Sequence, residues 1–132
     1  ALRPDKLTLA ALDATLALHH DQASRRRIPT LAMLSRTPQE LRSRAEELAL
    51  RVGGEVVATV GRVGGGSLPL DDLHSFAVAL PTPDGAETAA ARLRALDPAI
   101  VARISEGRLL LDLLTMSDAE VAEVCTLLGA RA

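Results

Sequence analysis

Arg3 is the first residue whose type and position suggest chemistry. It stands immediately before a segment with helical periodicity. A guanidinium beside the free backbone N–H groups of a helix start is suited to binding a phosphate-like anion. Taken alone, one arginine near a helix start carries no signal, and an ordinary surface position is the default interpretation.

A glycine-rich segment, residues 61–69, is the second candidate. Its centre consists of Gly64, Gly65, Gly66 and Ser67. Gly61 and Gly66 have the outer spacing of a Walker A motif, but Ser67 stands where that motif requires lysine, which argues against a nucleoside-triphosphate site. Successive glycines permit positive φ and a close approach of the backbone to a ligand. Spacing alone favours a flexible hairpin connection over a loop whose backbone approaches a ligand or another chain segment.

The other reactive side chains do not combine into a site. His19 and His20 are adjacent, so they project about 100° apart on a helix, and His74 is remote in sequence. We therefore predict no metal site. Cys125 lies on the apolar stripe of the last helix and is predicted to be a buried structural thiol. The three arginines at 25–27 could touch tRNA or phosphate, but three charges supply little affinity at physiological salt, which favours a solvated connection.

Helical signals in the first half predict two long helices. Residues 5–20 lack Gly and Pro and place Leu9, Leu12 and Leu16 on one stripe, which predicts a helix with a broad buried face. Residues 21–36 form a polar connection with a single helical turn after Pro29. A capping box with proline at the first helical position begins the second helix at Thr37, and Gly53-Gly54 ends it.

The second half alternates strand and helix signals in the order ββαββα. Strands are predicted at 55–60, 75–80, 100–105 and 108–114, with a tight hairpin turn at Glu106-Gly107. Capping patterns at Asp84 and Ser117 predict the two helices. The fold class is therefore α+β, a mostly antiparallel four-stranded sheet covered by helices. Residues 1–36 are predicted to be a linking helix and connection, and residues 37–132 a small α+β domain.

Composition narrows the functional classes. The chain has 132 residues, 48% of them hydrophobic and 24% charged, with a net charge of −2. Phe76 is the only aromatic residue, so base stacking and sequence-specific nucleic-acid recognition are disfavoured. Cys125 is the only cysteine, which favours a reducing, cytoplasmic compartment. No apolar run reaches the ~20 residues of a membrane helix. We expect Ala1 to be a cut point in a longer polypeptide.

The N-terminal segment resembles a signature of bacterial selenocysteine synthase, L-seryl-tRNA(Sec) selenium transferase. Residues 1–16 read Ala-Leu-Arg-Pro-Asp-Lys-Leu-Thr-Leu-Ala-Ala-Leu-Asp-Ala-Thr-Leu, similar to the family pattern Arg-Ala-x-Arg-x-Asp-Lys-x-Thr-x-Ala-Ala-Leu. Residues 28–31 and 64–69 resemble the family in order and spacing. The resemblance implies a fold-type I pyridoxal 5'-phosphate enzyme of which this chain is the C-terminal portion. The cofactor lysine would lie upstream, and Lys6 does not match it.

The same resemblance implies an activity, partners and site residues. The family converts seryl-tRNA(Sec) to selenocysteinyl-tRNA(Sec) with selenophosphate, in a large homo-oligomer. Arg3 matches an arginine that binds the phosphate or selenophosphate anion, and Gly64 to Ser67 would form an active-site loop. His74-Ser75 departs from a more usual Pro-Ser. The alternatives are a free-standing ligand-binding or dimerisation module, or the small domain of another fold-type I enzyme.

Overall fold

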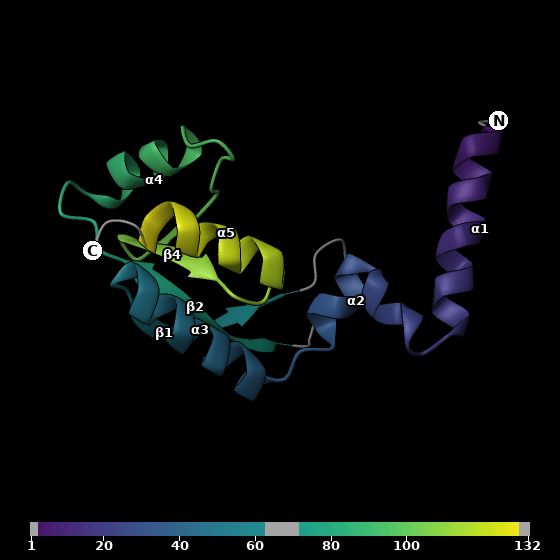
Figure 1. Ribbon diagram of the computed structural model, residues 1–132, viewed down its shortest axis with the longest axis horizontal. Coiled ribbons are helices and arrows are strands. Elements are labelled where there is room, and N and C mark those ends of the chain that lie inside the picture. Colours follow the sequence, from purple (N-terminus) through teal and green to yellow (C-terminus); the bar gives the residue numbers. More distant parts are fainter. Residues whose placement is uncertain (1–2, 63–71, 130–132) are drawn as a thin grey trace. The chain divides into compact units, whose positions relative to one another are not determined.

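The computed structural model describes residues 3–62 and 72–129 (Figure 1). Contacts within the chain divide it into two units, Ala1–Arg36 and Thr37–Ala132. Every helix in the described ranges is too short or too polar to cross a bilayer.

In the first unit, the described secondary structure consists of helices. It contains α1 (Lys6–His20), the 3₁₀ helix η1 (Ser24–Arg27) and α2 (Pro29–Leu34). Asp5 caps α1, because its Oδ1 accepts a hydrogen bond of 2.8 Å from the backbone N–H of Thr8. The predicted single turn after Pro29 extends to six residues.

The predicted buried face of α1 is wrong for this chain. No residue of α1 is buried, and the stripe of Leu9, Leu12 and Leu16 is 51–53% exposed. Inside the first unit α1 contacts η1, a short polar turn that has no apolar surface wide enough to cover the stripe. Periodicity specifies which face of a helix is apolar, but a second element must be present to bury it.

The second unit opens with α3 (Pro38–Val52), as the capping signal predicts. The Thr37 hydroxyl accepts from the N–H of Glu40, and Glu40 accepts in return from the N–H of Thr37 at 2.7 Å. Gly53 ends the helix with a φ of 68°, a conformation that glycine adopts without a steric penalty. Leu41, Ala45 and Leu48 are fully buried, so the predicted apolar face of this helix is confirmed.

Four antiparallel strands form the sheet. They are β1 (Glu55–Gly61), β2 (Leu73–Leu80), β3 (Arg103–Ser105) and β4 (Arg108–Asp112), in the spatial order β1-β2-β4-β3. The β3–β4 turn has positive φ at Glu106 (52°) and Gly107 (74°), which matches the twist of a two-residue hairpin. The predicted fold class, an α+β domain with a four-stranded antiparallel sheet, is confirmed.

The predicted start of the third strand and one predicted helix cap are wrong. β3 begins at Arg103, because Ile100 packs in the core and donates its N–H to the carbonyl of Leu93. α4 (Ala86–Arg94) has Gly85 at its N-cap position and no side-chain cap. Asp84, the predicted cap, instead forms a 3.1 Å ion pair with Arg92.

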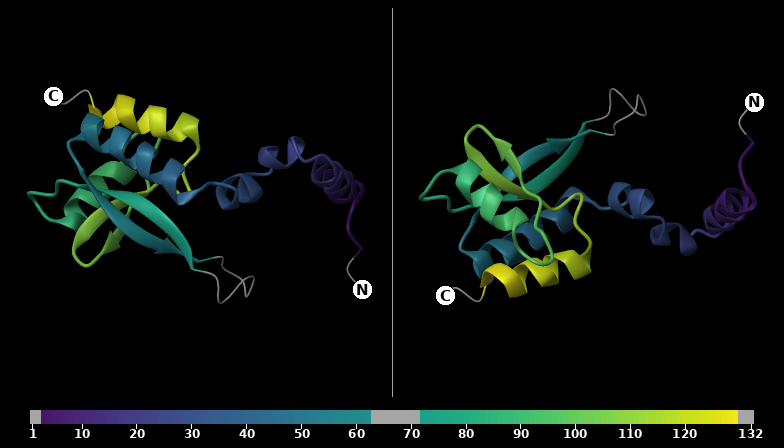
Figure 2. Two further views of the ribbon diagram at one scale, coloured as in Figure 1. Left: turned by 90° about the horizontal axis from the view of Figure 1, so that it is seen from below. Right: turned by 90° about the horizontal axis from the view of Figure 1, so that it is seen from above.

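One apolar core joins the three helices of this unit to a single face of the sheet. α5 (Asp118–Gly129) lies beside α3 on that face (Figure 2). The core draws on α3, β2, α4, β4 and α5, and its buried members include Leu41, Leu48, Val78, Ala90, Leu93, Leu109, Leu111, Leu113 and Val124. The opposite face of the sheet has a smaller apolar cluster of Ala77, Ala79 and Leu110.

Replacing Ser117 by alanine should lower the free energy of unfolding by about 1 kcal/mol. The Ser117 hydroxyl accepts a 3.2 Å hydrogen bond from the N–H of Glu120 at the start of α5, and alanine removes that acceptor. Urea unfolding followed by far-UV circular dichroism measures the change. Ser117→Thr keeps the hydroxyl and should be close to neutral, so an equal loss in both variants would contradict a capping role.

Candidate anion-binding arginine and base of the glycine loop

Arg3 lies in the extended segment ahead of α1, and it is exposed. The helix start beside it is partly occupied, since the Asp5 carboxylate already accepts from the N–H of Thr8. That hydrogen bond lowers the pKa of Asp5 below its ordinary value, so the carboxylate is ionised at neutral pH. The expectation that free helix N–H groups assist Arg3 is therefore weakened. An anion at this position would be bound by the guanidinium and repelled by Asp5.

Gly64, Gly65, Gly66 and Ser67 lie outside the described residues. The structure does describe the two strands that carry this loop. β1 ends opposite the start of β2, with Gly61 paired to Leu73. Just beyond this pair, Arg62 Nε lies 3.1 Å from Asp72 Oδ1, which joins the two ends of the loop on an exposed surface. β1 and β2 therefore form a regular antiparallel pair up to Gly61 and Leu73.

Asp112 is the centre of a group of polar side chains on the sheet, near the paired ends of β1 and β2. Its Oδ1 accepts from the Ser75 hydroxyl at 2.7 Å and its Oδ2 from the Thr59 hydroxyl at 3.0 Å. Arg103 lies 3.3 Å from the same carboxylate, and the N–H of Leu114 donates to it at 3.2 Å. The Ser75 residue is only 2% exposed. One carboxylate thus connects β1, β2, β3 and β4, and we call Asp112, Thr59, Ser75 and Arg103 the Asp112 cluster.

Sequence reasoning did not identify the Asp112 cluster. The signal was present, because Asp112 is the single charged residue within the apolar run from Leu109 to Leu114. A charged residue in such a strand is retained when partners satisfy it. Its partners come from three other strands, and their pairing depends on the strand order, which the sequence did not specify.

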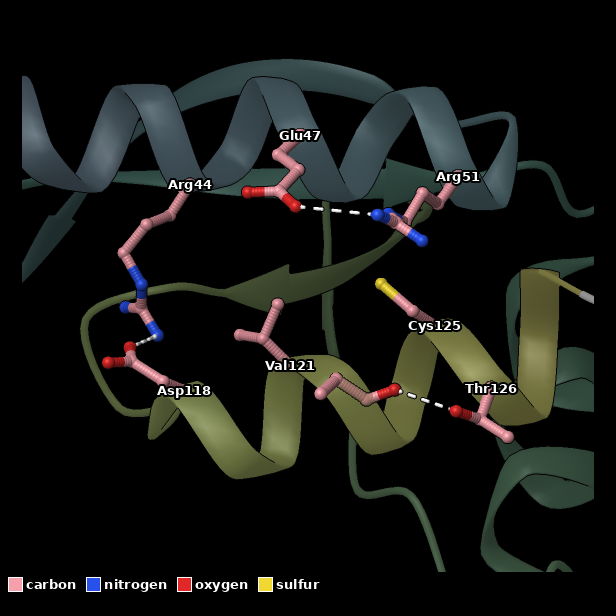
Figure 3. A pocket seen from close by; sticks show the side chains of 8 residues that line it. Arg44, Glu47, Arg51, Asp118, Val121, Cys125 and Thr126 are labelled. Carbon is pink, nitrogen blue, oxygen red and sulfur yellow. Dashed lines mark hydrogen bonds and ion pairs between the residues drawn. The ribbon is translucent and has the colours of Figure 1, made fainter.

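A groove of about 630 Å³ runs between α3 and α5 (Figure 3). Arg44 closes one end, where its guanidinium pairs with Asp118 at 2.9 Å. The same guanidinium donates to the carbonyls of Leu113 and Met116, both at 2.9 Å. Arg44 therefore fastens α3 to the connection between β4 and α5, which is a structural role.

Cys125 lines the same groove, facing Arg51 across it (Figure 3). It is half-buried rather than fully buried as predicted. Burial raises the pKa of its thiol, although the positive charge of Arg51 acts in the opposite direction. A thiol with a raised pKa is mostly protonated at neutral pH and is a poor nucleophile. Over residues 3–62 and 72–129, no three His, Cys, Asp or Glu side chains gather as metal ligands would.

The second unit is a small α+β domain, and in the first unit an exposed arginine, Arg3, precedes α1. The family model for L-seryl-tRNA selenium transferase matches residues 1–117. The chain belongs to this family, as residues 1–16, 28–31 and 64–69 suggested.

Individual relatives agree with the family match. L-seryl-tRNA(Sec) selenium transferase from Solidesulfovibrio magneticus is 44% identical over 98% of this chain, which corresponds to 30% of the relative. The proteins of the same name from Klebsiella pneumoniae subsp. pneumoniae and Salmonella paratyphi B are 43% and 40% identical over 89% of this chain, or 28% of each relative. The chain therefore spans less than a third of the length of these relatives.

Proposed function

We propose that this chain is the C-terminal portion of a selenium transferase that converts L-seryl-tRNA(Sec) to selenocysteinyl-tRNA(Sec), with selenophosphate as the selenium donor. The observation that carries the proposal is the family match over residues 1–117, which includes Arg3 and the segment after it. The relatives act on seryl-tRNA(Sec) by name. We propose the same substrate for the protein to which this chain belongs. We also propose that the full-length protein assembles into a homo-oligomer in the cytoplasm.

We assign pyridoxal 5'-phosphate to polypeptide outside these 132 residues. Lys6 is the only lysine of the chain. It lies exposed in the first turn of α1, where it lacks the enclosed setting that covalent attachment of a cofactor requires. When bound, the cofactor acts as an electron sink that lets the serine oxygen leave as water. We assign residues 37–132 to the small domain of such a fold-type I enzyme.

Arg3 contributes binding and orientation of the selenium donor in this proposal. Its planar guanidinium presents paired donors that fit two oxygens of a phosphate-type anion. The Asp5 carboxylate caps the start of α1 by accepting a hydrogen bond from the N–H of Thr8. This bond fixes the direction in which the chain enters the helix at Lys6, three residues after Arg3. We also assign Gly64 to Ser67 to the active site. In the sequence they lie between Arg62 and Asp72, whose ion pair joins the ends of the antiparallel strands β1 and β2.

Borohydride reduction followed by peptide mass spectrometry tests where the cofactor is attached. We expect the full-length protein to carry a reduced pyridoxyl adduct on a lysine outside this chain, and the 132-residue chain to carry none. Lys6→Arg in the full-length protein should leave the adduct yield unchanged. A stable adduct on Lys6 would contradict the assignment. Absence of selenocysteinyl-tRNA(Sec) when the wild-type full-length protein receives seryl-tRNA(Sec) and selenophosphate would refute the proposed function itself.

A further inference from the structure

Positive charge is concentrated in the first unit. Residues 1–36 contain six Lys and Arg against three Asp and Glu, a net charge of +3. Residues 37–132 contain nine basic and fourteen acidic residues, a net charge of −5. The overall charge of −2 therefore conceals a basic segment, and half of its cationic side chains are Arg25, Arg26 and Arg27 in the single turn of η1.

Among these three arginines, only Arg25 is bonded to a neighbouring group in the described part of the chain. Arg25 Nε donates a 2.9 Å hydrogen bond to the carbonyl of His19, so this side chain caps the negative end of α1. Arg26 and Arg27 are exposed, and neither forms an ion pair or a hydrogen bond within the described part of the chain. Three residues complete a 3₁₀ turn, so successive side chains project about 120° apart and their guanidiniums spread around it.

The one acidic side chain beside η1 is occupied elsewhere. The Asp21 carboxylate accepts from the N–H groups of Ala23 and Ser24 and from the Ser24 hydroxyl at 2.5 Å, so it caps the start of η1. The Ser24 hydroxyl lowers the pKa of Asp21, which keeps this carboxylate ionised in its capping role. The sequence alone favoured a solvated connection here. The structure adds a formed helical turn, and its last two arginines have no ion-pair or hydrogen-bond partner among residues 3–62 and 72–129.

We propose that Arg26 and Arg27, with Arg25 beside them, form a contact surface for the phosphate backbone of RNA. The inference rests on the proposed function, which supplies tRNA as the polyanion. Guanidinium groups fit phosphate oxygens in a bidentate manner, and such contacts need no aromatic platform, which this chain lacks. A membrane surface fits less well, because the polar side of α1 carries no row of Lys or Arg.

A pair of matched double variants tests the surface in the full-length protein, with fluorescence anisotropy of a labelled tRNA transcript as the readout. Arg26→Gln with Arg27→Gln should weaken binding roughly tenfold at about 0.1 M salt. It should also reduce the slope of log affinity against log salt concentration by about 2, one per phosphate contact. Arg92→Gln with Arg94→Gln removes the same charge from exposed positions on α4 and should change affinity less than about twofold.

The kinetic readout separates this inference from the function on which it rests. With Arg26 and Arg27 replaced, KM for seryl-tRNA should rise while kcat at saturating seryl-tRNA stays unchanged. Unchanged affinity and salt slope in a variant that still converts seryl-tRNA(Sec) would overturn the inference and leave the function standing. Equal losses in the α4 control would also overturn it. A third result would overturn the inference as well: the wild-type protein binds anionic phosphatidylserine vesicles through these arginines, while the variant lacking Arg26 and Arg27 binds tRNA as the wild type does.

Discussion

Replacing Arg3 by alanine in the full-length protein is expected to lower kcat/KM for selenophosphate about 10- to 100-fold, with unfolding unchanged. A hydrogen bond to a charged group contributes about 1.5–3 kcal/mol, and each 1.36 kcal/mol is a factor of ten in rate. Arg3 is exposed in an extended segment, so its removal leaves the helix and sheet contacts intact. Steady-state kinetics at limiting selenophosphate provide the measurement, with thermal unfolding as the check on stability.

Two variants sharpen the Arg3 experiment. Arg3→Lys keeps the positive charge and loses the planar fork, so its activity should lie between the wild type and alanine. Arg94→Ala removes another exposed arginine, on α4, and should leave kcat/KM unchanged. Wild-type turnover of Arg3→Ala at limiting selenophosphate would remove this residue from the anion site.

Replacing Asp112 by alanine is expected to lower the free energy of unfolding by about 2–4 kcal/mol. Most of this loss comes from Ser75, because its buried hydroxyl would have no acceptor. Thr59 and Arg103 contribute less, since the Arg103 side chain is 48% exposed and regains water. Asp112→Asn keeps one acceptor oxygen and should lose about half as much. Urea unfolding followed by far-UV circular dichroism measures each variant.

Asp84 provides the matched control for Asp112. It also pairs with an arginine, Arg92, at 3.1 Å, but both side chains are more than half exposed. Exposed ion pairs contribute less than about 1 kcal/mol, so Asp84→Ala should be nearly silent. Equal losses for Asp84→Ala and Asp112→Ala would show that the Asp112 cluster contributes no more than an ordinary surface pair.

Local signals predicted most of the second unit because each one acts within a few residues. The capping boxes at Thr37 and Ser117 form as expected, since their reciprocal hydrogen bonds span only three residues. The hairpin turn at Glu106-Gly107 also forms, because Gly107 adopts a positive φ without a steric penalty, although Glu106 must adopt one as well. The pattern at Asp84 resembled a capping box equally well and failed, since the side chain found Arg92 instead of the helix start.

The candidate site was predicted in part. The segment around Arg3 carried the family resemblance that the match over residues 1–117 confirms. The capping bond from the N–H of Thr8 to the Asp5 carboxylate, at the adjoining helix start, was not predicted. The anion-binding role of Arg3 and the role of the loop Gly64 to Ser67 stay predictions.

The sequence by itself determined the local elements, the α+β class and the family, because periodicity, caps, turns and short motifs are read from neighbouring residues. Tertiary structure alone decided the strand order β1-β2-β4-β3 and the Asp112 cluster that depends on it. It also decided that the leucine stripe of α1 stays exposed in this chain. Both outcomes depend on which parts of the chain, distant in sequence, pack against each other. A side chain is buried only where a second surface covers it, and the pattern along one segment does not specify that second surface.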